Sequence, residues 1–130
     1  MEISYFDKIK MAEFSGNTAI LRKIAEEDDP FIRAIVAQNG DTPLSLLDVL
    51  SKDAEDCVRL AVAENRCVSP KILDYLSLDK NQEIIQAIYL NRNTREETLR
   101  KIEEENEYLV KDLKYYREKI SFSKDNPSYS

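Results

Sequence analysis

The sequence predicts an all-α protein, a short α-solenoid of about three to four 26-residue repeats with two helices each. When the chain is aligned with itself at an offset of 26 residues, apolar residues fall into register without insertions. A fixed period of 20–50 residues is the signature of a solenoid. Only two Gly and four Pro occur among the 130 residues, and this composition favours helix over sheet.

Four apolar columns and two polar columns define the repeat. The apolar columns are expected to form the core, because their members recur at helical spacing within each repeat. They are Leu21, Leu47, Leu73 and Leu99; Ile24, Leu50, Leu76 and Ile102; Ile32, Val58, Ile84 and Val110; and Ile35, Ala61, Ala87 and Leu113. The polar columns are Asn39, Asn65 and Asn91, and the acidic residues Glu27, Asp53, Asp79 and Glu105.

The chain is expected to open with an N-terminal cap at residues 1–20, because the end of a solenoid exposes core that must be covered. Residues 5–14 have the pattern of a short amphipathic helix, with one side formed by Phe6, Ile9 and Phe14. Asn17 or Thr18 can cap the following helix, which is predicted at 19–26.

The repeats are expected to span 21–94, and each combines a shorter first helix with a longer second helix. A hydroxyl residue before the helix predicts a start, because its oxygen accepts a backbone N–H, and Pro fits the first helical position. First helices are predicted to start at Thr42-Pro43, at Ser69-Pro70 and at a capping box formed by Thr94 and Glu97. Second helices are predicted at 31–38, opened by Asp29-Pro30, and at 54–63, capped by Asp53 or a neighbour.

The segment Asp53 to Leu76 carries the phrase D-x-x-x-x-V-R-x-A-V-A-x-N followed by S-P-x-x-L-x-x-L. In this phrase the chain resembles the leucine-rich repeat variant family, with HEAT-like repeats as the near neighbour. The resemblance covers roughly residues 20–115. It implies a right-handed superhelix of alternating long and short helices, and no common catalytic activity. The third repeat departs from the pattern, since Ile85 replaces the Arg, Tyr89 replaces the second Ala and no Pro follows Thr94. The cysteine-rich iron–sulfur segment of some members has no counterpart here.

Residues 95–120 are predicted to form the C-terminal cap of a single domain spanning 1–120, followed by a disordered tail at 121–130. Apolar residues in the segment Arg95–Ile120 alternate three- and four-residue steps, which is heptad spacing. The segment could be a helix pair with a break near Glu105, as the repeat register implies. It could also be one long helix that pairs with a second copy in a homodimer. The heptads are few, which favours the helix pair.

Composition excludes several function classes and predicts a soluble, cytoplasmic protein. The chain has no His, so the commonest general base and metal ligand is missing, and Cys57 and Cys67 have no imidazole partner. We therefore expect no enzyme, no cofactor and no metal. The net charge of −6 counts against nucleic-acid binding, because binding phosphates requires a basic surface. No apolar run approaches the length of a membrane span, and the N-terminus lacks the pattern of a signal peptide.

Two sets of residues are candidates for contacts with a partner protein. In the third repeat, Ile85, Tyr89 and Leu90 replace smaller or polar residues, and such a patch marks an interaction site if it is exposed. The alternative is that this patch packs against the C-terminal helix. The basic residues Arg33 and Arg59 could bind acidic groups. An acidic residue lies six positions before each of them. A ladder of ion pairs between adjacent repeats therefore explains the acidic column and this basic column without a ligand.

The Asn column allows two interpretations of the same kind. The side chains could grip the backbone of an extended peptide. They could equally close the second helix of each repeat and hydrogen-bond to the adjoining repeat, since Asn supplies both a donor and an acceptor. The regularity of the column favours the internal role.

The sequence therefore predicts a non-catalytic protein- or peptide-binding module of unknown partner. Two alternatives remain open: an accessory or regulatory subunit of an enzyme complex, and a nucleic-acid backbone binder, against which the acidic balance counts.

Overall fold

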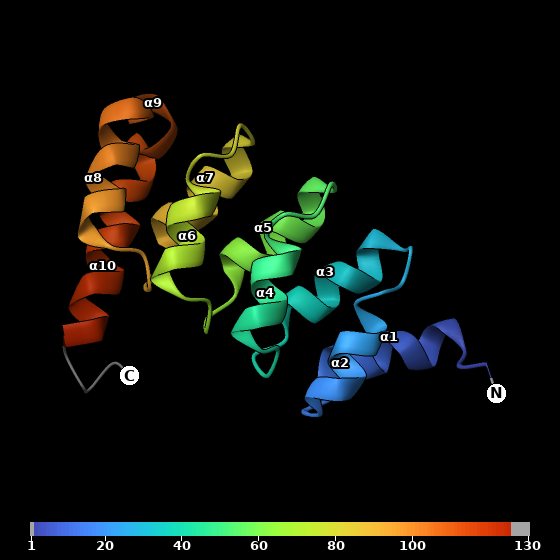
Figure 1. Cartoon of the computed structure of the whole chain (residues 1–130). Coiled ribbons are helices and arrows are strands. Elements are labelled where there is room, and N and C mark those ends of the chain that lie inside the picture. The colour runs from blue at the N-terminus through green and yellow to red at the C-terminus, as the bar shows by residue number, and fades with distance from the viewer. Residues whose placement is uncertain (1, 126–130) are drawn as a thin grey trace. The chain divides into compact units, whose positions relative to one another are not determined.

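A computed structural model describes residues 2–125 of the chain, with side chains described for residues 2–120. The described residues form helices and short loops and contain no strand, so the all-α prediction is confirmed (Figure 1). The helices group into two compact units, unit 1 (Met1–Val68) and unit 2 (Ser69–Ser130). The boundary between the units coincides with the predicted start of a repeat at Ser69. Unit 1 contains α1 to α5, and unit 2 contains α6 to α10.

Unit 1 contains an N-terminal helix followed by two helix pairs. Three of its helices begin at a side-chain cap: α1 at Ser4, α2 at Asn17 and α3 at Asp29, each of which accepts a backbone N–H. The last two agree with the predicted starts. The helices are α1 (Tyr5–Phe14), α2 (Thr18–Ile24), α3 (Pro30–Gln38), α4 (Leu44–Leu50) and α5 (Asp56–Glu64).

Unit 2 begins with one more pair of a shorter and a longer helix and then departs from this alternation. Its helices are α6 (Pro70–Leu76), α7 (Gln82–Leu90), α8 (Glu96–Glu105), α9 (Glu107–Val110), the 3₁₀ turn η1 (Lys111–Leu113) and α10 (Lys114–Asp125). The break that the repeat register predicted near Glu105 is confirmed, because Asn106 leaves helical conformation at φ −134° and ψ 41°. The segment Arg95–Ile120 is therefore not one long helix. Residues 121–125, expected in the disordered tail, belong to α10, and 126–130 lie outside the described residues.

Two of the predicted helix caps are wrong, and the cause is the same in both. The hydroxyl of Thr42 donates to the carbonyl of Val36 at 2.6 Å, and that of Thr94 donates to the carbonyl of Ile88, also at 2.6 Å. Each of these carbonyls also accepts the N–H of the C-cap residue, Asn39 or Asn91, so the Thr supplies a second donor at the end of the preceding helix, and neither Thr caps the next one. The capping box at Thr94 does not form.

Other helix starts follow the local sequence more closely. Ser69 caps α6 as predicted and accepts the N–H of Ile72 at 3.3 Å. The α5 helix begins later than predicted, at Asp56, and its N-cap is Glu55 with no side-chain cap bond. Asp53 instead accepts the N–H of Glu55 at 3.0 Å, the geometry of an Asx turn that leads into the helix.

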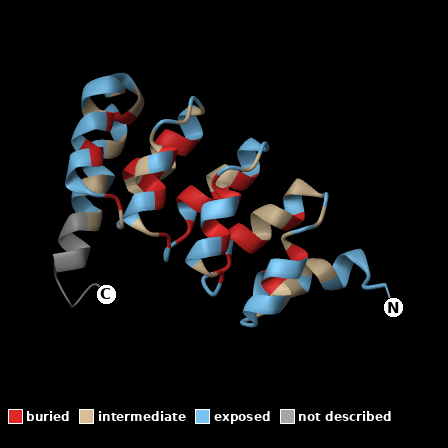
Figure 2. Cartoon of the chain, in the orientation of Figure 1, coloured by how far each residue is buried: buried red, intermediate tan, exposed pale blue. Residues whose placement is uncertain are grey.

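The predicted apolar columns form the cores of both units, as the buried residues in Figure 2 show. All four members of the first three columns are at most 4% exposed. The fourth column is less consistent, since Ala61 is buried whereas Ile35, Ala87 and Leu113 are half-buried. Burial follows the register because equivalent positions in each helix pair meet equivalent neighbours.

The N-terminal helix α1 differs from its prediction in which side chains it buries. It contacts α2 and α3 and fully buries Ala12, whereas Ile9 is half-buried. Phe6 and Phe14, expected on the covered side, are 65% and 76% exposed. The close approach of α3 requires a small side chain at the contact, so the aromatic side chains lie on the opposite face.

Candidate functional site

The Asn column has an internal structural role in unit 1. The side-chain amide of Asn65 donates to the carbonyls of Ala37 and Asn39 at 2.7 and 3.2 Å, and its oxygen accepts the N–H of Cys67 at 2.7 Å. Asn39 donates in the same way to the end of α1. Helix ends leave carbonyls without intrahelical donors, and each Asn supplies that donor from the next repeat. These side chains are therefore not available to grip a peptide.

Arg117 continues this column at the same 26-residue offset, which the sequence interpretation missed. Its Nη1 donates to the carbonyl of Asn91 at 2.8 Å, as Asn65 donates to the carbonyl of Asn39. Burial of the guanidinium lowers the pKa of Arg117, and its Nε is buried without a hydrogen-bond partner among the described residues. The repeat register was the signal that could have identified this residue, although Arg replaces Asn.

The predicted basic column contributes to packing within unit 1. Arg33 binds both carboxylate oxygens of Asp53, at 2.8 and 3.0 Å, and donates to the carbonyls of Glu27 and Asp28 at 2.9 and 2.8 Å. These contacts occupy four of the five guanidinium N–H donors. The hydrogen bonds from Arg33 hold the pKa of Asp53 below its usual range and raise that of Arg33. The ion pair connects adjacent repeats, which is the structural alternative to a ligand site.

Arg59 is held in a similar way. It donates to the carbonyls of Asp53 and Ala54 at 2.9 and 3.1 Å, and it pairs with Asp56 at 2.7 Å. Its side chain is 18% exposed, close to the 17% of Arg33. Both candidate cations are thus engaged by their own chain and offer little surface to a partner.

The candidate patch in the third repeat is part of the core of unit 2, which corrects its expected role as a partner surface. Tyr89 is fully buried, Ile85 is 5% exposed and Leu90 is half-buried. The α7 helix that carries them contacts α8, α9, η1 and α10. Burial raises the pKa of Tyr89, and its hydroxyl donates to Glu103 at 3.4 Å. Larger side chains occur here because the C-terminal segment covers this face, as the internal alternative assumed.

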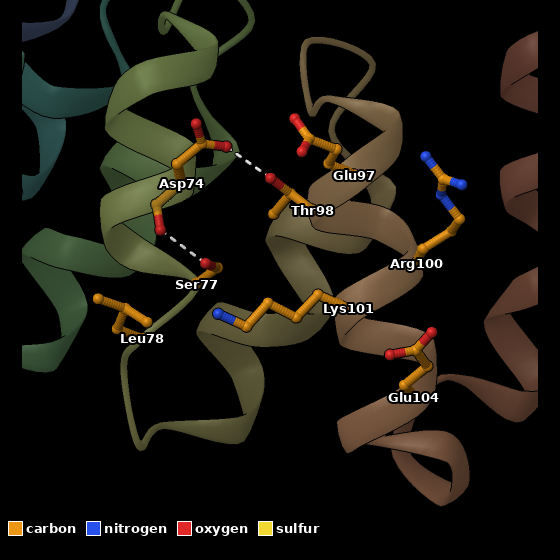
Figure 3. Close-up of a pocket in the computed structure, with 8 residues that line it drawn as sticks. All are labelled: Asp74, Ser77, Leu78, Glu97, Thr98, Arg100, Lys101 and Glu104. Carbon is orange, nitrogen blue, oxygen red and sulfur yellow. Dashed lines mark hydrogen bonds between the residues drawn. The ribbon is translucent and has the colours of Figure 1, made fainter.

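An open groove of about 570 Å³ lies between α6 and α8 in unit 2, and we call it the α6–α8 groove. Figure 3 shows its side chains, which come from the end of α6, the loop that follows and the length of α8. The lining residues are Asp74, Ser77, Leu78, Glu97, Thr98, Arg100, Lys101 and Glu104. None of them was a predicted site residue.

The floor of the α6–α8 groove is held by a polar cluster around Asp74. One carboxylate oxygen accepts from the hydroxyl of Thr98 at 2.5 Å, and the other pairs with Arg95 at 2.9 Å. The hydroxyl of Ser77 donates to the carbonyl of Asp74 at 2.6 Å. Charge-assisted hydrogen bonds are the stronger kind, so this cluster fixes α6 against α8. A sequence signal existed, because Thr98 is polar where earlier repeats carry Leu46 and Ile72.

The rim of the α6–α8 groove presents side chains that remain available. Arg100, Lys101, Glu97 and Glu104 make no ion pair or hydrogen bond through their side chains within the described part of the chain. Lys101 extends across the groove toward Ser77 and Leu78 (Figure 3). The apolar side chain of Leu78 is 69% exposed. The groove thus combines apolar contact area with charges of both signs.

The two hydroxyl groups of the α6–α8 groove are held by hydrogen bonds within unit 2. The one at the rim of α6, Ser77, donates to a backbone carbonyl and has no imidazole or lysine base in hydrogen-bond contact. Among the described residues, no three Cys, Asp or Glu side chains group in a way that could hold a metal ion.

No helix in the described part of the chain is long and apolar enough to cross a membrane.

Comparisons of the chain with protein-family models, with curated proteins and with solved structures give no match. The resemblance to the leucine-rich repeat variant family therefore rests on the sequence phrase alone.

Proposed function

We propose that this protein is a non-catalytic module that binds a partner protein or peptide through the α6–α8 groove. The observation that carries the proposal is the exposed apolar side chain of Leu78 in the groove lining, together with the cations Arg100 and Lys101, which make no ion pair within the described residues. Protein interfaces are enriched in Tyr and Arg, and a few anchors carry most of the binding energy.

The rigidity of the groove favours binding because little has to be ordered when a partner arrives. Asp74, Thr98 and Arg95 hold the facing helices through short polar contacts, so the relative position of α6 and α8 is set before binding. Rigid surfaces lose less conformational entropy on association, which improves affinity without new contacts.

The side chains define the chemistry of the partner segment. An apolar residue of the partner can pack on Leu78, and a carboxylate can pair with Lys101, which crosses the groove. Glu97 and Glu104 at the rim disfavour a strongly acidic segment through like-charge repulsion. The groove therefore fits a segment of mixed charge with an apolar anchor.

Photo-cross-linking in the producing cell tests this proposal. A photoreactive amino acid replaces Leu78, and a matched control replaces Val49, which is 63% exposed on α4 in unit 1. We expect a discrete protein adduct from position 78 and none of the same mass from position 49. Adding Lys101→Glu should reduce the adduct, whereas Lys23→Glu on exposed α2 should not. No adduct at position 78, or identical adducts at both positions, would refute the groove as a binding surface.

The identity of the cross-linked chain also distinguishes the accessory-subunit alternative. If the adduct contains an enzyme whose activity changes on removal of this protein, the module acts as a regulatory subunit. If the adduct contains a non-catalytic chain, the module serves in assembly.

A further inference from the structure

The solvent-facing side of α1 carries an apolar stripe formed by Ile3, Phe6 and Phe14, with Lys10 between the two Phe residues. Ile3, Phe6 and Phe14 are 42%, 65% and 76% exposed, whereas Ala12 on the opposite side is fully buried. The ammonium of Lys10 lies over the ring of Phe6, 4.6 Å from its centroid. Steps of four residues place Phe6, Lys10 and Phe14 on one helical face, and Ile3 lies just before the N-cap Ser4 of this helix. We call this face the α1 stripe.

The α1 stripe is large for a surface with no covering element. Because a Phe side chain buries roughly 150–250 Å² in a core, the exposed parts of its three apolar residues amount to on the order of 350 Å². The largest apolar patch on a typical monomer is about 300–600 Å² and is often functional. The stripe therefore has the size of an interaction surface.

An ion pair shows that α1 occupies the place of a second helix in the repeat pattern. Lys8 on α1 pairs with Glu27 at 2.9 Å, and Arg33 on α3 pairs with Asp53 at 2.8 Å. Both cations come from a helix and both carboxylates belong to the acidic column of the next helix pair. The two contacts are thus equivalent in consecutive repeats.

Backbone contacts at the end of α1 follow the same pattern. The amide of Asn39 donates to the carbonyls of Ala12 and Ser15, both at 2.9 Å, as Asn65 donates to the end of α3. The stacking that covers one side of α1 is therefore complete, and α1 contacts only α2 and α3 among elements with several contacts. The stripe is the side that the repeat packing leaves open.

We propose that the α1 stripe binds a second copy of this chain in an antiparallel helix pair, a surface separate from the α6–α8 groove. Around the stripe, Asp7 and Lys10 carry opposite charges, and Asp7 makes no side-chain ion pair within the described residues. An antiparallel register of two α1 helices sets Asp7 of each copy opposite Lys10 of the other. The stripe is then complementary to itself in charge, as a two-fold interface requires.

The size of the surface sets the strength of the dimer. Two stripes with their polar flanks bury an area near or below about 1,200 Å², which is the range of weak and transient contacts. We therefore expect a dissociation constant on the order of 10–100 μM. The net charge of −6 on each copy opposes association and contributes to the weakness of the dimer.

Sedimentation of the full chain from about 5 to about 500 μM tests this directly. The average mass should rise from the 15.1 kDa of the monomer toward twice that value. Phe6→Glu with Phe14→Glu should weaken dimerisation at least tenfold. Val49→Glu, which adds a charge at a comparably exposed apolar residue on α4, should leave it unchanged.

A charge exchange tests the register. Asp7→Lys and Lys10→Glu, made singly, should each weaken the dimer several-fold, because each places like charges opposite one another twice. The combined variant should restore the dimer to near wild-type strength. Circular dichroism confirms that each variant is folded, and the wild-type concentration series is independent of variant folding.

Two results would overturn the proposal. A wild-type chain that stays monomeric across the whole range leaves the α1 stripe for a foreign helix. A dimer that survives the Phe6 and Phe14 changes but dissociates with Tyr115→Glu and Tyr116→Glu forms through the C-terminal segment Arg95–Ile120. These two Tyr side chains are 60% and 58% exposed.

Discussion

Truncation of Asn65 should destabilise the protein more than any other single change of a polar side chain in unit 1. Asn65 is 2% exposed, and it bonds the carbonyls of Ala37 and Asn39 and the N–H of Cys67. After Asn65→Ala, the carbonyl of Asn39 keeps the N–H of Thr42 at 3.1 Å. The carbonyl of Ala37 loses the donor that Asn65 supplies, and the N–H of Cys67 loses its acceptor.

The magnitude follows from these two groups. A buried polar group left without a partner costs about 1–3 kcal/mol, and the Cys67 end is discounted because Cys67 is exposed and water can reach it. The expected loss is about 2–4 kcal/mol in the free energy of unfolding, a large fraction of the stability of a small protein. Urea unfolding of the full chain, followed by circular dichroism, measures this difference.

Two companion variants sharpen the test. Gln38→Ala removes an exposed amide at the end of α3, next to Asn39 in the preceding repeat, and should change stability by less than about 0.5 kcal/mol. Asn65→Asp keeps the acceptor for Cys67 but sets a carboxylate against the carbonyl of Ala37. Protonation restores a donor, so the folded protein raises the pKa of the introduced group and this variant should lose stability as pH rises.

An Asn65→Ala variant that costs less than about 1 kcal/mol, or no more than Gln38→Ala, would refute the internal role of the Asn column. The peptide-gripping interpretation of these side chains would then have to be tested in its place.

Three further predictions concern the core, an ion pair and the C-terminal helix. Leu73→Ala should cost about 2–5 kcal/mol, since Leu73 is fully buried, and an unchanged melting temperature would contradict its burial. Arg33 lowers the pKa of Asp53, so the stability that this pair contributes is present above the unfolded pKa of about 3.9 and is lost as pH falls through the folded pKa. Asp53→Asn should therefore lower stability at pH 7 and flatten the acid limb of the stability curve; an unaltered acid limb would exclude the pair. Arg117→Ala removes the bond to the carbonyl of Asn91, so amide hydrogen exchange in α10 should accelerate while that in α6 stays unchanged.

Local sequence patterns predicted the structure correctly where the neighbours of a residue are close in sequence or recur with the 26-residue repeat. Asn17, Asp29 and Ser69 cap their helices as predicted, because a cap depends only on the next three residues. The break after Glu105 also followed from the repeat register.

Predictions failed where two partners compete for the same side chain. Thr42 and Thr94 had the sequence context of helix caps, but each hydroxyl donates to a carbonyl six residues earlier. Each carbonyl lies near the end of its helix and also accepts the N–H of Asn39 or Asn91, and only the path of the loop brings the Thr hydroxyl within reach.

The candidate site was the least predictable part of the protein. Tyr89 had the composition of an interface residue, yet the C-terminal segment covers it. Leu78 attracts no attention in the sequence, since a single apolar residue beside a helix is common. It becomes a candidate only in a groove whose cations Arg100 and Lys101 have no partner among the described residues.

The sequence by itself determined the helical class, the repeat register and the buried columns, because a 26-residue period places equivalent side chains in equivalent surroundings. Only the tertiary structure decided which apolar surfaces remain uncovered. The α10 helix covers the apolar face of α7, whereas the stripe on α1 has no covering helix among the described residues. The exposure of a helix face depends on whether a segment distant in sequence packs against it. The periodicity within that helix carries no information about such packing.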